Sequence, residues 1–207
     1  SIENVNAGGG DDTVTGNSGN NILRGEGGVD ILYGNEGDDT LNGGLGADDM
    51  RGGIGDDIYI VDNASDSVTE NFSEGTDIIY SSVTFTASSD VENLTLTGSS
   101  DISATGNSLN NVLTGNSGDN TLTGNGGDDT LNGGLGADDM RGGTGDDIYI
   151  VDNASDSITE NFSEGTDIIY SSAATFIMSN DIENLVLTGS SDISATGNSL
   201  NNVLTGN

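Results

Sequence analysis

The chain has 207 residues, of which 35 are acidic and only 3 are basic, so its formal charge is −32 at pH 7. Such a charge repels nucleic acid and anionic membranes, and no apolar run approaches the roughly 20 residues of a membrane span. Cysteine, histidine and lysine are absent, which excludes Ser-His-Asp and Cys-His catalysis, thiolate or imidazole zinc sites and disulfide cross-links. The remaining chemistry is that of oxygen ligands, and the small apolar content requires some stabilisation besides a core.

A repeat of about 90 residues organises the chain, because residues 43–60 recur at 133–150 with one change and residues 100–116 recur at 191–207. The opening Ile2-Glu3-Asn4 matches Val91-Glu92-Asn93, so we expect residues 1–6 to be the tail of a preceding unit. We also expect the sequence to be a piece of a longer array.

Residues 7–60 divide without insertion into six blocks of nine residues, and residues 106–150 divide into five. Position 8 of each block is apolar and its neighbours are mostly polar, which is typical of a three-residue strand with one inward side chain. The other six positions combine glycine with Asp or Asn and predict turns. Two strands and two turns make a coil of 18 residues, which buries too little apolar surface to be stable unless neighbouring coils stack. We therefore predict an all-β fold, a right-handed parallel β-roll or β-solenoid.

An 18-residue coil places the position-6 residues of alternate blocks in columns. The predicted columns are Asp12, Asp30 and Asp48; Asn21, Asp39 and Asp57; Asn111, Asp129 and Asp147; and Asn120 with Asp138. Carboxylates stacked about 4.8 Å apart repel one another strongly unless a cation lies between them. Calcium suits this place because it accepts six to eight oxygen ligands in flexible geometry, whereas magnesium requires a tighter octahedron.

The blocks fit the pattern G-G-x-G-x-D-x-U-x, in which U is apolar, and the sequence closely resembles the RTX, or haemolysin-type, calcium-binding repeat family. The resemblance implies that position-6 side chains and turn carbonyls of blocks two apart clamp several calcium ions. It assigns the metal ligands to Asp12, Asp30, Asp39, Asp48, Asp57, Asp129, Asp138 and Asp147. The asparagines Asn21, Asn111 and Asn120 keep an oxygen but lose the charge, so we expect weaker sites there.

Two spacers, residues 61–105 and 151–196, break the nine-residue pattern but keep strand-like pieces, and a third array begins at residues 197–207. We interpret the spacers as longer, irregular solenoid rungs, and we expect them to pack over Ile58 and Ile60. Five spacer acids and their copies are either extra calcium ligands or a solvated acidic face, and the second interpretation is favoured for any single one. These acids are Asp62, Asp66, Glu70, Glu74 and Asp77.

The resemblance implies an extracellular or cell-surface bacterial protein, exported unfolded by type I secretion and folded by calcium outside. Near-identical tandem repeats favour a stalk, fibre or surface-layer element of an adhesin. The alternative is the calcium-folding carboxyl-terminal module of a secreted enzyme or toxin. We expect no catalysis, although paired carboxylates also occur in glycoside hydrolases, and the irregular position 3 argues against ice binding. The expected partners are calcium and other copies of the chain end to end, without nucleic acid or direct membrane insertion.

Overall fold

The structure, a computed structural model, describes residues 4–207, so Ile2 and Glu3 of the expected tail at residues 1–6 lie outside the described residues. The described chain contains 23 strands and no helix, and hence no helix of the length and apolar character needed to cross a membrane. It divides into two compact units, Ser1–Thr97 and Gly98–Asn207. The predicted all-β solenoid of stacked parallel strands is confirmed.

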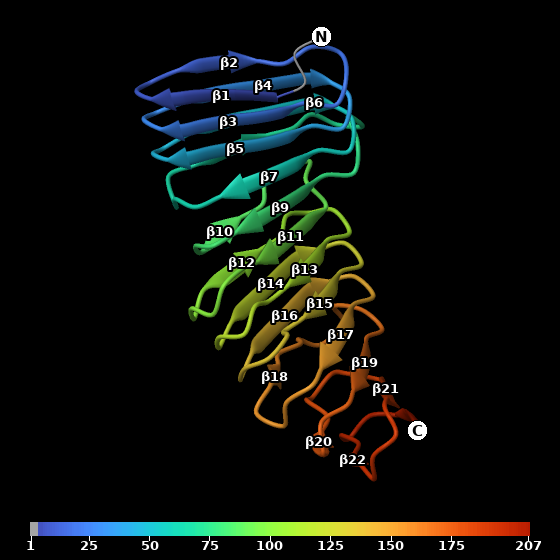
Figure 1. Ribbon diagram of the computed structural model, residues 1–207. Coiled ribbons are helices and arrows are strands. Elements are labelled where there is room, and N and C mark those ends of the chain that lie inside the picture. Colours follow the sequence, from blue (N-terminus) through green and yellow to red (C-terminus); the bar gives the residue numbers. More distant parts are fainter. Residues whose placement is uncertain (1–3) are drawn as a thin grey trace. The chain divides into compact units, whose positions relative to one another are not determined.

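The first unit winds between two parallel sheets whose strands run in opposite directions (Figure 1). One sheet contains β1 (Asn4–Gly9), β3 (Ile22–Gly27), β5 (Thr40–Leu45), β7 (Ile58–Val61), β9 (Ile78–Ser81) and β11 (Asn93–Leu96). The other contains β2 (Thr13–Thr15), β4 (Ile31–Glu36), β6 (Asp49–Ile54) and β8 (Ser67–Thr69), and the short β10 (Phe85–Thr86) lies in the spacer. Consecutive strands therefore alternate between the sheets, as a coil requires.

The second unit repeats this winding. Its longer sheet contains β13 (Val112–Thr114), β15 (Thr130–Asn132), β17 (Ile148–Val151), β19 (Ile168–Ser171), β21 (Asn184–Leu187) and β23 (Val203–Thr205). The facing strands are β12 (Ser103–Thr105), β14 (Thr121–Gly126), β16 (Asp139–Thr144) and β18 (Ser157–Ile158), and β20 (Thr175–Ile177) pairs with β22 (Ser194–Thr196).

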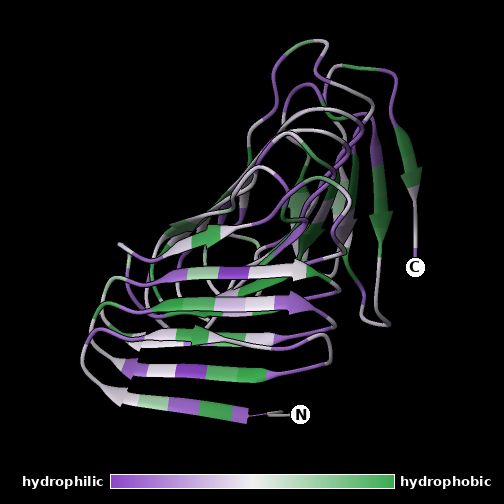
Figure 2. Ribbon diagram, turned by 90° about the horizontal axis from the view of Figure 1, so that it is seen from above, coloured by the Kyte–Doolittle hydropathy of each residue, from purple (hydrophilic) through white to green (hydrophobic). Residues whose placement is uncertain are grey.

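The core consists of stacked position-8 side chains. In the first unit, Leu23 pairs with Leu41 and Leu41 with Tyr59, and all three side chains are fully buried. Buried and partly exposed residues alternate along strands such as β3 and β7, so that one face of each strand points inward, and apolar residues recur from strand to strand (Figure 2). Each rung buries few apolar side chains, and the turns must supply additional stabilisation.

The spacers add rungs to the stack. Met50 pairs with Val68, which keeps the 18-residue register, whereas Tyr59 pairs with Ile79, 20 residues on. The next rung is shorter, since Ile79 pairs with Leu94, so the expectation that all spacer rungs are longer is wrong. The expected packing of the spacer over Ile58 and Ile60 is also wrong. These two residues pair laterally with Ile78 and Tyr80 and remain half-buried on the outer face, because the spacer extends the sheet edge.

Candidate metal sites

The position-6 residues of alternate blocks lie in register along each array. The backbone N–H of Asp12 donates to Asp30 Oδ1 at 2.8 Å, and the N–H of Asp30 donates to Asp48 Oδ1 at 2.7 Å. The same bond, 2.6 to 2.8 Å long, joins Asn21 to Asp39, Asp39 to Asp57, Asn111 to Asp129, Asn120 to Asp138 and Asp129 to Asp147. In each of these aspartates except Asp12, one carboxylate oxygen therefore satisfies a backbone donor of the preceding rung.

The other carboxylate oxygen has no such partner. In the described structure, Oδ2 accepts no hydrogen bond in the seven buried position-6 aspartates, each at most 1% exposed: Asp30, Asp39, Asp48, Asp57, Asp129, Asp138 and Asp147. Asp12, at the head of the first column, is half-buried. A buried carboxylate oxygen without a donor is strongly disfavoured unless it meets a proton or a cation.

Glycine at position 1 makes room for this oxygen. A methyl group added at Gly25 would lie 2.1 Å from Asp30 Oδ2 and 2.6 Å from the carbonyl oxygen of Gly43, two blocks on. The same arrangement brings Asp39 Oδ2 and the Gly52 carbonyl oxygen to Gly34. An unpaired carboxylate oxygen and a backbone carbonyl from the next rung therefore approach the same glycine.

Position 2 differs between the aspartate blocks and the asparagine blocks. In aspartate blocks it has a left-handed backbone, with φ of 76° at Glu26 and 84° at Asn35. In the block of Asn21, the position-2 residue Asn17 lacks positive φ, and its N–H donates to Asn21 Oδ1 at 2.7 Å. The same bond to position 6 forms in three further asparagine blocks: Asn107 to Asn111, Asn116 to Asn120 and Asn198 to Asn202. The side-chain oxygen in these turns thus already has a backbone donor.

Position 5 forms a second ladder that our sequence analysis missed. Its side chains are exposed, and here the later rung donates its N–H to a side chain of the earlier rung, the reverse of the position-6 bonds. The N–H of Asp56 donates to Asp38 Oδ1 at 3.1 Å, and the N–H of Thr76 donates to Asp56 Oδ1 at 2.8 Å. The available signal was the frequency of Asp and Asn at position 5, next to the better-known position 6.

Three spacer acids continue the inner columns: Asp66 follows Asp48, and Asp77 and then Glu92 follow Asp57. Asp66 Oδ1 accepts the N–H of Asp48 at 3.0 Å, and Asp66 Oδ2 accepts the N–H of Asn63 at 3.1 Å, so both of its oxygens are bonded. In the other column, the N–H of Asp77 donates to Glu92 Oε2 at 2.8 Å. The sequence signal for Asp66 was its distance of 18 residues from Asp48, although its block lacks glycine.

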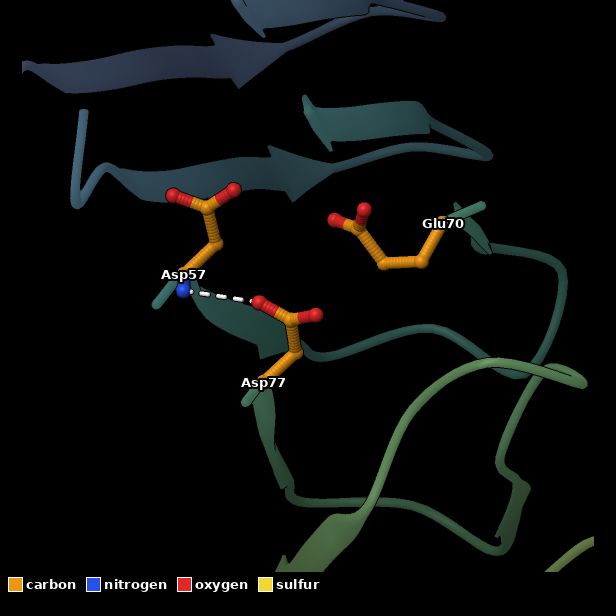
Figure 3. Close-up of side chains that lie close together, drawn as sticks. All are labelled: Asp57, Glu70 and Asp77. Atoms are coloured by element: carbon orange, nitrogen blue, oxygen red, sulfur yellow. Dashed lines mark hydrogen bonds between the residues drawn. The ribbon is translucent and has the colours of Figure 1, made fainter. Parts of the chain in front are cut away.

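The end of each array carries a cluster of three buried carboxylates. Asp57 precedes β7, Asp77 precedes β9 and Glu70 follows β8, and one oxygen from each lies within 4.8 Å of the others (Figure 3). The copy in the second unit consists of Asp147, Glu160 and Asp167. Two other acids of the first spacer lie outside the cluster: Asp62 is exposed, and Glu74 Oε2 accepts hydrogen bonds from Asn71.

Burial shifts the protonation of these groups. It raises the pKa of Glu70 to about 8, with the charges of Asp77 and Asp57 adding to the effect. Burial likewise raises the pKa of Asp57 to about 7, against the lowering effect of the Asp39 backbone N–H, and raises the pKa of Asp129 to about 7. Without a counter-charge these carboxylates favour the protonated form at pH values where exposed acids are ionised.

The donor set fits calcium. Carboxylate and carbonyl oxygens are hard ligands, and the absence of cysteine and histidine removes the softer donors that zinc and copper prefer. Bound at the unpaired Oδ2 atoms, calcium would supply the positive charge that the turns lack. The arginines do not do so there: the two ion pairs within residues 4–207 join Arg51 to Asp49 and Arg141 to Asp139, on the exposed face.

Comparison with known protein families also points to calcium. Four stretches of the chain match the family described as RTX calcium-binding nonapeptide repeat: residues 2–32, 24–59, 105–140 and 130–158. Together they cover more than half of the chain, and they stop short of both Glu70 and Glu160. No match was found among curated proteins.

Proposed function

The chain belongs to the RTX calcium-binding nonapeptide repeat family, and we propose that it is an extracellular structural segment that folds when it binds calcium. The repeats and the β-solenoid fit a calcium-binding repeat protein. The observation that carries the proposal is the unpaired, buried Oδ2 of each fully buried position-6 aspartate. Ion binding and folding are then one event, because the oxygens converge only when neighbouring rungs stack.

The proposed ligands are the position-6 aspartates together with the position-1 carbonyls of the following rung. They are Asp12, Asp30, Asp39, Asp48, Asp57, Asp129, Asp138 and Asp147. We assign only a weak role to Asn21, Asn111 and Asn120, because each carboxamide oxygen already accepts a backbone N–H.

The charge of −32 supports a role outside the cell. Where calcium is scarce, the acidic chain repels itself and stays unfolded, and where calcium is millimolar it folds, so export and folding are separated by ion concentration. The tandem 90-residue repeat is suited to a stalk, fibre or surface-layer element of an adhesin. A catalytic or pore-forming domain elsewhere in the full reading frame would instead favour the module of a type I-secreted enzyme or toxin.

End-to-end association belongs to the same proposal. Each rung pairs with the next through a parallel ladder, and near-identical repeats give rungs of different chains the same pairing pattern. Calcium would promote association by lowering the charge that keeps chains apart. Sedimentation velocity in calcium and in chelator tests this part separately.

Circular dichroism during a calcium titration tests the central proposal. We expect a cooperative gain of β signal with calcium and a much smaller gain with magnesium at the same concentration. A chain that is fully folded in excess chelator, or that responds equally to both ions, would contradict calcium-dependent folding.

A further inference from the structure

We propose that Asp57, Glu70 and Asp77 form a composite calcium site at the end of the first array, and that Asp147, Glu160 and Asp167 form its copy in the second. The site differs from the nonapeptide sites because the spacer supplies two of its three carboxylates. The inference rests on the proposed function in taking calcium as the ion, and it adds a position outside the nine-residue pattern.

The geometry brings the three side chains together from separate elements. Asp57 and Asp77 lie on adjacent rungs, joined by the hydrogen bond from the Asp57 N–H to Asp77 Oδ1 at 2.8 Å. Glu70 approaches them from the other side, and its carboxylate points toward theirs (Figure 3). The exposed fractions of Asp57, Glu70 and Asp77 are 0%, 5% and 1%, so bulk water screens this concentration of charge poorly.

Two of the oxygens have no partner. Asp57 Oδ2 and Glu70 Oε2 are buried and accept no hydrogen bond, and neither ion pair of the described structure involves the cluster. A hydrogen-bonded acidic network would leave no such atoms. Unpaired oxygens that face one another from three carboxylates indicate a cation.

Tyr59 distinguishes this site from the turns before it. A methyl group added at Gly25, in the block of Asp30, would meet Oδ2 first and then a glycine carbonyl of the next rung. At Gly52 the second atom that it would meet is the Tyr59 hydroxyl. That hydroxyl accepts the N–H of Gly52 at 2.6 Å and donates to Glu70 Oε1. The tyrosine hydroxyl therefore takes the place of the carbonyl and orients Glu70 through its hydrogen bond.

The proposed site links the last turn of the array to the spacer. Glu70 and Asp77 lie on either side of a loop that two backbone donors also tie to the array: the Gly55 N–H donates to the Glu74 carbonyl oxygen at 2.8 Å, and the Thr76 N–H donates to Asp56 Oδ1 at 2.8 Å. Three carboxylates also give this site more negative charge than a turn with one, and ligand charge is a principal determinant of calcium affinity. We therefore expect this site to order the rung that joins array to spacer.

The test uses the whole chain with Glu70→Gln and Glu160→Gln combined, which keeps shape and removes one charge from each cluster. The matched control combines Glu74→Gln and Glu164→Gln, the same change in the same two loops. Isothermal titration calorimetry should show two fewer tightly bound calcium ions per chain in the first variant, one for each cluster, and the wild-type number in the control.

A wild-type ion count and affinity in the first variant would overturn the composite site while leaving calcium-dependent folding intact. A wild-type chain that binds no calcium at all would overturn the proposed function and the composite site together. These two failures are therefore distinguishable in one experiment.

A second measurement does not depend on how the glutamine variant folds. Terbium(III) substitutes for calcium and emits when a nearby tyrosine is excited, and the chain contains no tryptophan. Tyr59→Phe with Tyr149→Phe should remove most of the sensitised emission, whereas Tyr80→Phe with Tyr170→Phe should retain most of it. Equal emission from the two variants would overturn the site.

Discussion

The backbone amide of Asn17 donates to the side-chain oxygen of Asn21 at 2.7 Å. In the next block, Glu26 has a φ of 76° and Asp30 Oδ2 remains without a donor. A change of one side-chain atom, nitrogen for oxygen, thus accompanies a change of backbone conformation four residues earlier. The asparagine turn supplies its own donor to the side-chain oxygen, whereas the aspartate turn leaves Oδ2 without one.

Asn21→Asp should convert an asparagine turn of this kind into an aspartate turn. Asn is compatible with the left-handed backbone at position 2, as Asn35 shows with φ of 84°, so Asn17 can adopt it. We expect one additional calcium ion per chain by calorimetry. Asn20→Asp, which adds the same charge at the exposed neighbour, should leave the ion count unchanged, and equal counts in the two variants would contradict the distinction between turns.

Asp39→Asn removes the charge of an internal position while preserving the oxygen that accepts the Asn21 N–H. We expect the calcium midpoint measured by circular dichroism to rise by about tenfold, a typical cost of disturbing a metal site. Asp38→Asn removes the same charge at the exposed position 5 and should shift the midpoint much less. Equal shifts would indicate that general charge, not the column, controls folding.

Gly25→Ala should abolish one site by filling it. The added methyl group would lie 2.1 Å from Asp30 Oδ2, far inside van der Waals contact, so the carboxylate must move. Gly27→Ala is the control in the same turn, because its nearest neighbour would be 3.8 Å away and its φ is not positive. Calcium titration should show a raised midpoint for the first variant alone. A raised midpoint for both variants would mean that the turn needs flexible glycines in general, and would contradict the steric explanation.

The pH dependence should be visible in chelator. Folding raises the pKa of Glu70 to about 8 and that of Asp57 to about 7, well above the values of about 4 in an unfolded chain. A raised pKa contributes stability below the unfolded value, and this contribution is lost as pH rises through the folded value. The ion-free β signal should therefore be larger at pH 5 than at pH 8. Saturating calcium should flatten this dependence, because the ion keeps the carboxylates ionised; a signal in chelator that falls on acidification would contradict the assignment.

Leu41→Ala tests the core in the calcium-loaded protein. Leu41 is fully buried between Leu23 and Tyr59, so its truncation should lower the free energy of unfolding by about 2–5 kcal/mol in urea titrations. Leu45→Ala removes the same atoms from a side chain that is 76% exposed and should have little effect. Similar losses in both would show that the position-8 stack is not the core.

The nine-residue period was sufficient to predict the fold and the core, because position 8 is the one position with a large apolar side chain in every block. It also predicted which position-6 residues share a column. It could not predict that Asp30 divides its two oxygens between a backbone amide and an open site, since this depends on rung spacing and side-chain orientation. Glu70 was one of several spacer acids, and only the 20-residue rung between Tyr59 and Ile79 brings it back to Asp57.

The hydrogen bond between Asp30 and Asp48 runs from the amide of the earlier rung to the side chain of the later rung. The rung that contains Asp48 supplies the acceptor for that amide, and the carbonyl beside Asp30 Oδ2 comes from Gly43 on the same later rung. Each turn is therefore completed by residues that are synthesised after it. Folding that proceeds from the amino terminus would therefore always leave one unfinished rung at its leading edge, and deletion of a rung would remove both the acceptor and the carbonyl from the turn before it.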